Sequence, residues 1–233
     1  MRISDDLLAV ELPFEFGGIP GHLFIPVILH QDGGVTLVDT GTPGSLPAIR
    51  DELNAAGRDL RDVRTVLITH HDPDHIGSLA DVVEASGAQV LSDPREIPYV
   101  EGTLPPQKVI VMDPRFGPVQ HHKVSRALQP GEVLPVAGGV RAVPTPGHTF
   151  GHTAYFLERG GILLTGDSFS VDAGAGRLLG PAPHVTPDLG PAHRSLRVMA
   201  ELPVQAILGY HGGLLARDAR EQLAQLAGDL APA

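Results

Sequence analysis

The chain has 233 residues, and its 17 basic and 27 acidic side chains give a formal net charge of −10 with neutral histidines. This acidic balance, with lysine only at positions 108 and 123, argues against a nucleic-acid-binding protein, and the lack of cysteine excludes disulfides, thiolate metal sites and a cysteine nucleophile. The N-terminal residues show neither a signal-peptide pattern nor about 20 consecutive apolar residues, so we expect a cytoplasmic protein that does not bind membranes.

Short apolar, β-branched runs punctuated by Gly and Pro predict strands, and amphipathic stretches predict helices. Strands are expected at Leu23–Leu29, Val35–Val38, Val63–Ile68, Val90–Leu91, Val109–Val111, Val140–Val143, Thr153–Leu157, Ile162–Leu164 and Ala206–Leu208. Helices are expected at Leu46–Ala56, Ile76–Ala85, Ala192–Glu201 and Leu214–Leu226. Because strands and helices alternate, the sequence predicts an α/β fold with a single domain over residues 1–233. The Pro-rich residues at about 92–130 are expected to form an irregular cap or insert.

Polar side chains follow five of the apolar runs directly. The segments are ThrLeuValAspThrGly (36–41), LeuIleThrHisHisAspProAspHisIleGly (67–77), ProThrProGlyHisThr (144–149), LeuLeuThrGlyAsp (163–167) and IleLeuGlyTyrHisGlyGly (207–213). In α/β folds, ligands bind outside the carboxyl ends of strands, where loops from distant parts of the sequence converge. We therefore expect these His and Asp side chains to lie close together.

The densest cluster is the run of six residues from His70 to His75, which contains only His, Asp and Pro. It could be a solvated turn in which Asp74 caps the following helix, but imidazole and carboxylate are also the ligands of Zn²⁺, Mn²⁺ and Fe²⁺. In an extended stretch His70 and Asp72 point to one side, because side chains alternate. Asp74 and His75 follow on the turn and could reach a second ion.

Three further residues, His148, Asp167 and His211, are less informative alone. Either histidine could be a structural loop residue, and Asp167 could simply cap a turn. Their shared position after apolar strands favours metal ligation for all three, with Asp167 as the candidate bridging carboxylate.

In order and spacing these residues resemble the metallo-β-lactamase superfamily. The family pattern Thr-His-x-His-x-Asp-His, a lone His, a bridging Asp and a final His has counterparts in Thr69–His75, His148, Asp167 and His211. The resemblance implies an αββα four-layer sandwich of two mixed β-sheets flanked by helices, with two divalent metal ions per chain. It places His70, Asp72 and His148 on one ion, Asp74, His75 and His211 on the other, and Asp167 between them. Asp39 and His152 are expected to support the ligands without binding metal.

One position departs from the family pattern, because Asp72 stands where the family has its second histidine. An anionic oxygen in place of a neutral imidazole makes the first site harder and more negative. Zn²⁺ is expected from the family, and Mn²⁺ or Fe²⁺ also suits the carboxylate.

A binuclear site predicts a hydrolase that cleaves an ester-like bond (a lactone, carboxylic ester or thioester) with a metal-bridging hydroxide as nucleophile. Asp74 is the expected catalytic residue, which orients the hydroxide or receives its proton. An iron-dependent redox enzyme acting on O₂ or a persulfide is the alternative, and a phosphodiesterase is a further one.

The irregular segments predict the substrate contacts. Tyr99, Phe116 and His184 are expected to line the substrate pocket, whereas His121 and His122 are expected in solvent. The expected partner is a small-molecule substrate, and the chain is expected to be a monomer or homodimer.

Overall fold

The computed structural model describes residues 1–16, 19–110 and 114–230. The chain divides into two compact units, the first made of Met1–Leu12 and Ile25–Leu128 and the second of Pro13–Phe24 and Gln129–Ala233. Nothing in this division tests the expectation of a single domain, which stays a prediction.

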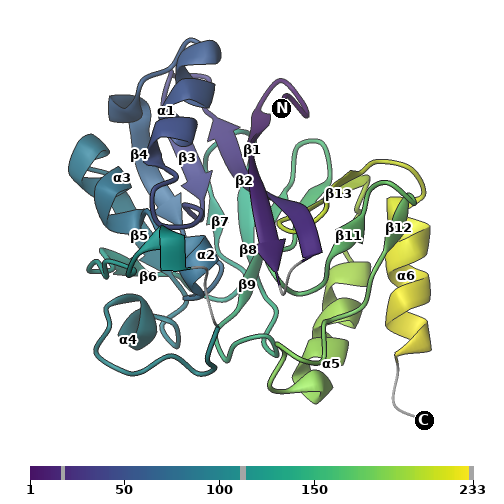
Figure 1. The fold of residues 1–233 in the computed structure, drawn as a ribbon. Coiled ribbons are helices and arrows are strands. Elements are labelled where there is room, and N and C mark those ends of the chain that lie inside the picture. The colour runs from purple at the N-terminus through teal and green to yellow at the C-terminus, as the bar shows by residue number, and fades with distance from the viewer. Residues whose placement is uncertain (17–18, 111–113, 231–233) are drawn as a thin grey trace. The chain divides into compact units, whose positions relative to one another are not determined.

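The first unit is built on a mixed sheet with the strand order β1-β2-β3-β4-β5-β6 (Figure 1). Its strands are β1 (Leu7–Phe16), β2 (Ile19–Leu29), β3 (Val35–Val38), β4 (Val63–Leu67), β5 (Gln89–Ser92) and β6 (Arg126–Ala127). Strand β3 pairs antiparallel with β2, and β3 to β6 run parallel. The end of β1 from Pro13 and the start of β2 up to Phe24 belong to the second unit. The parallel strands bring the loops after β3, β4 and β5 to one edge of the sheet.

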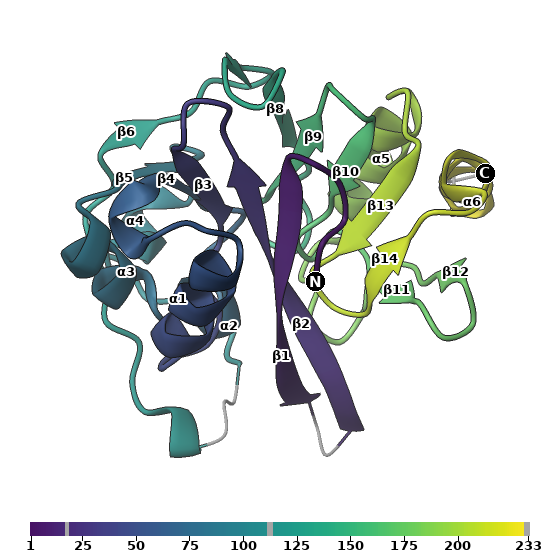
Figure 2. The same ribbon diagram turned by 90° about the horizontal axis from the view of Figure 1, so that it is seen from above.

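Helices connect these parallel strands. They are α1 (Leu46–Ala55), α2 (Pro73–Ile76), α3 (Leu79–Ser86) and α4 (Ile97–Val100), together with the 3-10 helices η1 (Leu60–Asp62) and η2 (Pro114–Phe116). Helix α1 begins after Ser45 with Pro47 in its first turn, and α3 ends at Gly87 in the left-handed conformation. The start of α1 and the end of α3 lie within one residue of their predicted positions. In Figure 2, α1 and α3 lie side by side along strands β3 to β5.

The second unit has its own mixed sheet, in the order β14-β13-β10-β9-β8-β7, and a separate hairpin of β11 and β12. Its strands are β7 (Val133–Leu134), β8 (Val140–Pro144), β9 (Thr153–Leu157), β10 (Ile162–Leu164), β11 (Val171–Asp172), β12 (Arg177–Leu178), β13 (Ala206–Gly209) and β14 (Gly213–Leu215). Only β10 and β13 pair in parallel within this described sheet, so the loops after both strands leave from the same edge.

Two helices, α5 (Leu189–Ala200) and α6 (Ala219–Asp229), cover this sheet. Leu196 and Met199 of α5 and Leu223 of α6 pack into one apolar cluster with Phe156 of β9 and Ile207 of β13. All five side chains are fully buried, and this apolar contact fixes the helices on the sheet.

The expected strands appear within a few residues of their predicted positions, except at Val109–Val111. Val109 and Ile110 are not in a strand, and residue 111 lies outside the described residues. Strand β1 and the first half of β2 were not expected.

Two helix predictions were wrong in part. The helix expected at Ile76–Ala85 is interrupted between α2 and α3, where the Ser78 hydroxyl donates a hydrogen bond to the Thr42 carbonyl at 2.7 Å and accepts one from the Ser45 N–H at 2.8 Å. The helix expected at Leu214–Leu226 begins only at Ala219, because β14 pairs with β13 as a hairpin.

In the part of the chain that the structure describes, no helix combines the length and apolar character needed to cross a lipid bilayer.

Candidate metal centre

The predicted cluster of ligands lies at the carboxyl end of β4 in the first unit. The chain leaves β4 through Thr69, and Asp72 is the N-cap residue of the short helix α2, which contains Asp74 and His75. Asp74 is therefore inside the helix and does not cap it. Although their side chains are polar or charged, the residues from 69 to 72 and residues 74 and 75 are all buried. Buried groups of this kind require partners, so a solvated turn does not describe this segment.

The structure brings the four predicted ligands of the first unit together. The Nε2 atom of His70 lies 3.1 Å from Oδ2 of Asp72, and Nε2 of His75 lies 3.8 Å from Oδ2 of Asp74. The rings of His70 and His75 have centroids 4.0 Å apart. The backbone turn thus presents two imidazoles and two carboxylates to one small volume.

Hydrogen bonds determine which nitrogen of each imidazole can bind a metal. The Thr69 hydroxyl donates to Oδ2 of Asp39 at 2.6 Å, so it accepts from Nδ1–H of His70 at 2.9 Å. Nδ1 of His75 donates to Oδ2 of Asp39 at 2.8 Å. In both rings the proton therefore sits on Nδ1, which leaves the Nε2 lone pair for an ion.

Asp39 organises this arrangement from the loop after β3. Its fully buried carboxylate also accepts the backbone N–H of Thr69 at 2.8 Å. Burial raises the pKa of Asp39, and the electrostatic interaction with His75 and the hydrogen bonds from His75 and Thr69 oppose that rise. Asp39 has a positive φ of 63°, a left-handed conformation that Asp and Asn tolerate better than most residues.

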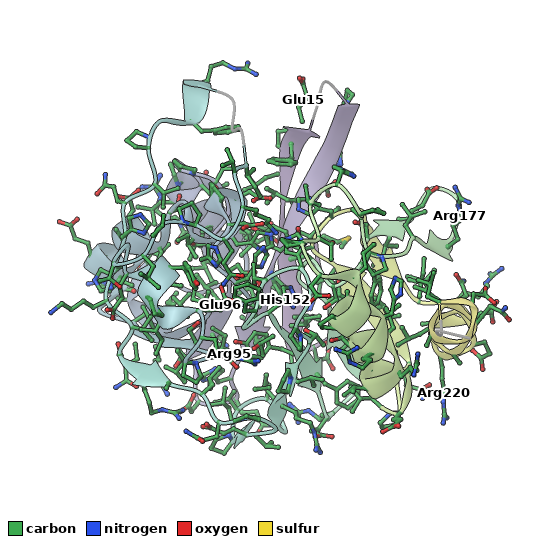
Figure 3. All side chains as sticks on the ribbon, turned by 90° about the horizontal axis from the view of Figure 1, so that it is seen from below. Glu15, Arg95, Glu96, His152, Arg177 and Arg220 are labelled. Atoms are coloured by element: carbon green, nitrogen blue, oxygen red, sulfur yellow. The ribbon has the colours of Figure 1, made fainter. Side chains whose placement is uncertain are left out.

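His71 faces a different set of partners. Its Nδ1 and its backbone N–H both bond Oε2 of the buried Glu96, and its Nε2 accepts the backbone N–H of Gln107 at 3.3 Å. The ring of Tyr99 stacks on His71 with centroids 4.6 Å apart. Figure 3 shows Glu96 among the side chains of the first unit. The sequence analysis did not identify Glu96, because no pattern links it to a histidine 25 positions earlier.

The second unit holds the remaining predicted ligands, which converge on Asp167. Oδ2 of Asp167 lies 3.5 Å from Nε2 of His148, and Oδ1 lies 3.5 Å from Nε2 of His211. Each carboxylate oxygen therefore faces a different imidazole.

His152 supports Asp167 through the backbone. Its Nε2 accepts the N–H of Asp167 at 3.0 Å, and its Nδ1 lies 2.8 Å from the Thr145 hydroxyl. Both ring nitrogens thus have protein partners. Its predicted role as a supporting residue without a metal bond stays a prediction, as do the predicted ligand roles.

Glycine next to His211 permits the required backbone path. Gly212 has a φ of 99°, and a Cβ there would lie 1.6 Å from the carbonyl oxygen of Val171. Gly147, next to His148, has a φ of 143°, and a Cβ there would lie 2.5 Å from Ala192. Only glycine allows these loops to approach β11 and α5 so closely.

The predicted substrate residues lie in varied surroundings. Tyr99 and Phe116 are half-buried and His184 is exposed, and their substrate contacts stay predictions. His121 and His122 bond backbone carbonyls through Nδ1, at Val100 (3.1 Å) and Lys123 (2.9 Å) respectively.

The donor atoms of each unit fit a divalent metal ion. Imidazole Nε2 atoms, with the tautomer fixed at His70 and His75, and carboxylate oxygens suit Zn²⁺, Mn²⁺ and Fe²⁺ alike. In metal sites a histidine ligand typically donates its other ring N–H to a carboxylate, as His75 does to Asp39, and this bond raises the basicity of the ligand.

Comparison with known proteins identifies the class. Residues 25–211 match the family model of the metallo-beta-lactamase superfamily, and the chain belongs to this superfamily of metal-dependent hydrolases. The predicted family and the predicted fold class of mixed sheets with flanking helices are confirmed.

Sequence identity to individual members of the superfamily is about 30%. The chain is 32% identical over 180 residues to hydroxyacylglutathione hydrolase of Methylobacillus flagellatus, covering 76% of this chain and 57% of that protein. It is 30% identical over 219 residues to the probable metallo-hydrolase YflN of Bacillus subtilis, covering 83% and 81%. The chain spans about half the length of the hydroxyacylglutathione hydrolases that it matches.

Solved structures show the same fold. The metallo-beta-lactamase family protein TTHA1429 of Thermus thermophilus superposes with a TM-score of 0.70 at 26% identity, covering 96% of this chain and 79% of that one. A metallo-beta-lactamase of Pontibacter korlensis superposes with a TM-score of 0.75 at 14% identity, covering 98% of each chain.

Proposed function

We propose that the chain is a two-metal hydrolase that cleaves an ester-like bond in a small molecule, with a thioester as the first candidate. One ion would be held by His70, Asp72 and His148, the other by Asp74, His75 and His211, with Asp167 bridging. Two such ions lower the pKa of a bound water toward neutrality and polarise a carbonyl oxygen. This chemistry needs no serine or cysteine nucleophile, which agrees with the absence of cysteine from the sequence.

The observation that carries this proposal is the position of the Asp167 carboxylate. Its two oxygens each lie 3.5 Å from the Nε2 of a different histidine, His148 or His211. A carboxylate that binds a single ion would need only one of its two oxygens directed toward a neighbouring histidine. The backbone of Asp167 is meanwhile fixed through His152, so the carboxylate is positioned before any ion arrives.

Asp74 is the candidate for the proton-transfer step. It is buried in α2, and its Oδ2 lies 3.8 Å from Nε2 of His75, the nitrogen available for metal. A carboxylate at this position can accept a proton from the attacking water and later deliver it to the leaving group. Tyr99, Phe116 and His184 remain the candidate substrate contacts.

The choice of a thioester comes from the relatives. Several proteins that match at 26–34% identity are named hydroxyacylglutathione hydrolase, so by name they hydrolyse an acyl-glutathione. A lactone or a carboxylic ester presents the same carbonyl and differs in its leaving group.

The test is elemental analysis of the protein purified without added metal, followed by assays with an acyl-glutathione thioester, a lactone, a carboxylic ester and a phosphodiester. About two equivalents of zinc or manganese per chain with turnover of a carbonyl substrate would support the proposal. A metal-free chain that gains neither metal nor activity on reconstitution, or an iron protein that consumes O₂, would overturn it.

A further inference from the structure

A buried carboxylate of the first unit supports the turn from Thr69 to His75, the ligand turn, from outside it. Oε2 of Glu96 accepts the backbone N–H of His71 at 3.1 Å and also bonds Nδ1 of the same residue. The side chains of Glu96 and His71 are only 0% and 2% exposed. One carboxylate oxygen therefore holds both the main chain and the ring of His71.

The parallel sheet brings these two residues together. Strands β4 and β5 pair in parallel, so the chain leaves both strands at the same edge of the sheet. His71 lies in the loop after β4, and Glu96 lies in the loop after β5, where its backbone N–H bonds the Asp93 carbonyl at 2.9 Å. Glu96 is the N-cap residue of α4, yet its side chain does not cap that helix. The carboxylate is directed to His71 instead.

Two further contacts fix the ring of His71. The backbone N–H of Gln107 can only donate, so Nε2 of His71, 3.3 Å away, accepts it and the ring proton lies on Nδ1, toward Glu96. The ring of Tyr99 stacks on the imidazole with centroids 4.6 Å and planes 22° apart. Both nitrogens of His71 thus bond protein groups, which suits a supporting role and not metal ligation.

The place of His71 in the sequence connects this support to the metal ligands. His71 stands directly between His70 and Asp72, whose Nε2 and Oδ2 atoms lie 3.1 Å apart. Because His71 is fixed by its main chain and by its ring, the two neighbouring side chains start from a fixed backbone. Ligands that are ordered during folding lose less entropy when an ion binds, so their affinity for the ion is higher.

We propose that Glu96 is a positioning residue for the metal centre, which acts through His71 to hold the ligand turn in its metal-binding form before an ion is present. This inference rests on the proposed two-metal site, in which His70 and Asp72 are ligands. Glu96 lies outside the superfamily motif and acts on the backbone between two ligands. Its role is therefore separate from that of Asp39, which bonds the ring of His75 directly.

The test measures metal affinity of the full chain, independently of activity. Protein stripped with a chelator receives Zn²⁺, or in parallel Mn²⁺, as the only metal, and competition with a chromophoric chelator gives the free metal concentration at half-saturation. Glu96→Met has a similar length but no acceptor, and it should raise that concentration about tenfold or more. Glu96→Gln, whose amide oxygen can accept both N–H groups, should stay within about threefold of wild type.

A matched control separates positioning from a loss of stability. Asp93 is also buried and lies in the same turn before α4, but its carboxylate bonds the backbone and side chain of Arg95. Asp93→Ala should lower the urea concentration at half-unfolding and leave the metal affinity at the wild-type value.

A second variant tests the route through His71. His71→Phe keeps an aromatic ring against Tyr99 but removes both ring nitrogens, so it should weaken metal binding in the same direction as Glu96→Met. It replaces Glu96→Met if that variant does not fold. In the double variant the loss of binding free energy should be smaller than the sum of the two single losses, because both substitutions break the same contact.

The outcomes separate this role from the proposed function. Wild-type metal affinity in Glu96→Met and His71→Phe, or an equal loss of affinity in Asp93→Ala, would overturn the positioning role and leave the two-metal hydrolase intact. A wild-type chain that binds neither Zn²⁺ nor Mn²⁺ would overturn both.

Discussion

Replacing Asp39 by Asn tests whether the tautomer of His75 is set by the protein. Asn tolerates the positive φ of 63° as well as Asp does, so the backbone should not change. In the native protein Nδ1–H of His75 lies 2.8 Å from Oδ2 of Asp39, which accepts its proton. When the amide places its NH₂ at the position of Oδ2, two donors face each other. The imidazole can recover a hydrogen bond only by moving its proton to Nε2, the nitrogen needed for metal.

The magnitude follows from the bonds lost. Oδ2 of Asp39 accepts from His75 and from the Thr69 hydroxyl, and a hydrogen bond to a charged group contributes about 1.5–3 kcal/mol. Removing the buried charge offsets part of this loss, because burial already disfavours the ionised form of Asp39. We expect the free energy of unfolding to fall by about 1–3 kcal/mol and the affinity for Zn²⁺ to fall roughly 10–100-fold.

The assay combines urea unfolding of the metal-free protein with Zn²⁺ titration against a chromophoric chelator. The matched control is Asp51→Asn, since the Asp51 side chain is 72% exposed and makes a surface ion pair with Arg50. It should leave both quantities unchanged within error. Wild-type Zn²⁺ affinity in Asp39→Asn would refute the assignment of the His75 proton to Nδ1.

Three other substitutions have definite expected outcomes. Asp167→Asn should lower the metal content per chain and abolish hydrolysis while the circular dichroism spectrum is retained; full metal content with full activity would contradict the bridging role. Asp72→His restores the family's histidine and should keep activity while moving metal preference toward Zn²⁺, and an inactive, metal-free product would show that the loop requires the carboxylate. Gly212→Ala should destabilise the chain by about 1–3 kcal/mol in urea unfolding, because its Cβ would lie 1.6 Å from the Val171 carbonyl oxygen. Gly176→Ala is the control, since Gly176 also has a positive φ but no atom within 4 Å of the new Cβ, and an equal loss in both would exclude the clash as the cause.

Much of the fold was predictable because local pattern and tertiary environment agree. The run before His70 is rich in β-branched residues and forms β4, in which Val63, Val66 and Leu67 are buried. The glycine after the second predicted helix ends α3 in the left-handed conformation. The family motif depends on order and spacing along the chain, which the sequence contains in full.

Predictions were wrong or incomplete where contacts with residues distant in the sequence decide the local structure. Leu214 and Leu215 fit the start of a helix as well as a strand by periodicity, and the pairing of β14 with β13 selects the strand. The contacts of Glu96 with His71 and of Lys108 with Asp72 join residues 25 and 36 positions apart. Neither pair belongs to a sequence pattern, so only the fold reveals them.

The discontinuous make-up of the second unit bears on how the chain is made. Residues 13–24 leave the ribosome early, yet they belong with residues 129–233, and the N–H of Phe24 bonds the carbonyl of Tyr210 at 2.8 Å. At about 5–20 residues per second, the 105 residues from 129 to 233 take roughly 5–20 s to synthesise. During that interval the early segment has apolar strand residues without their final neighbours. Biogenesis of this protein should therefore depend on chaperones that shield nascent strands, more than that of a chain whose units are contiguous.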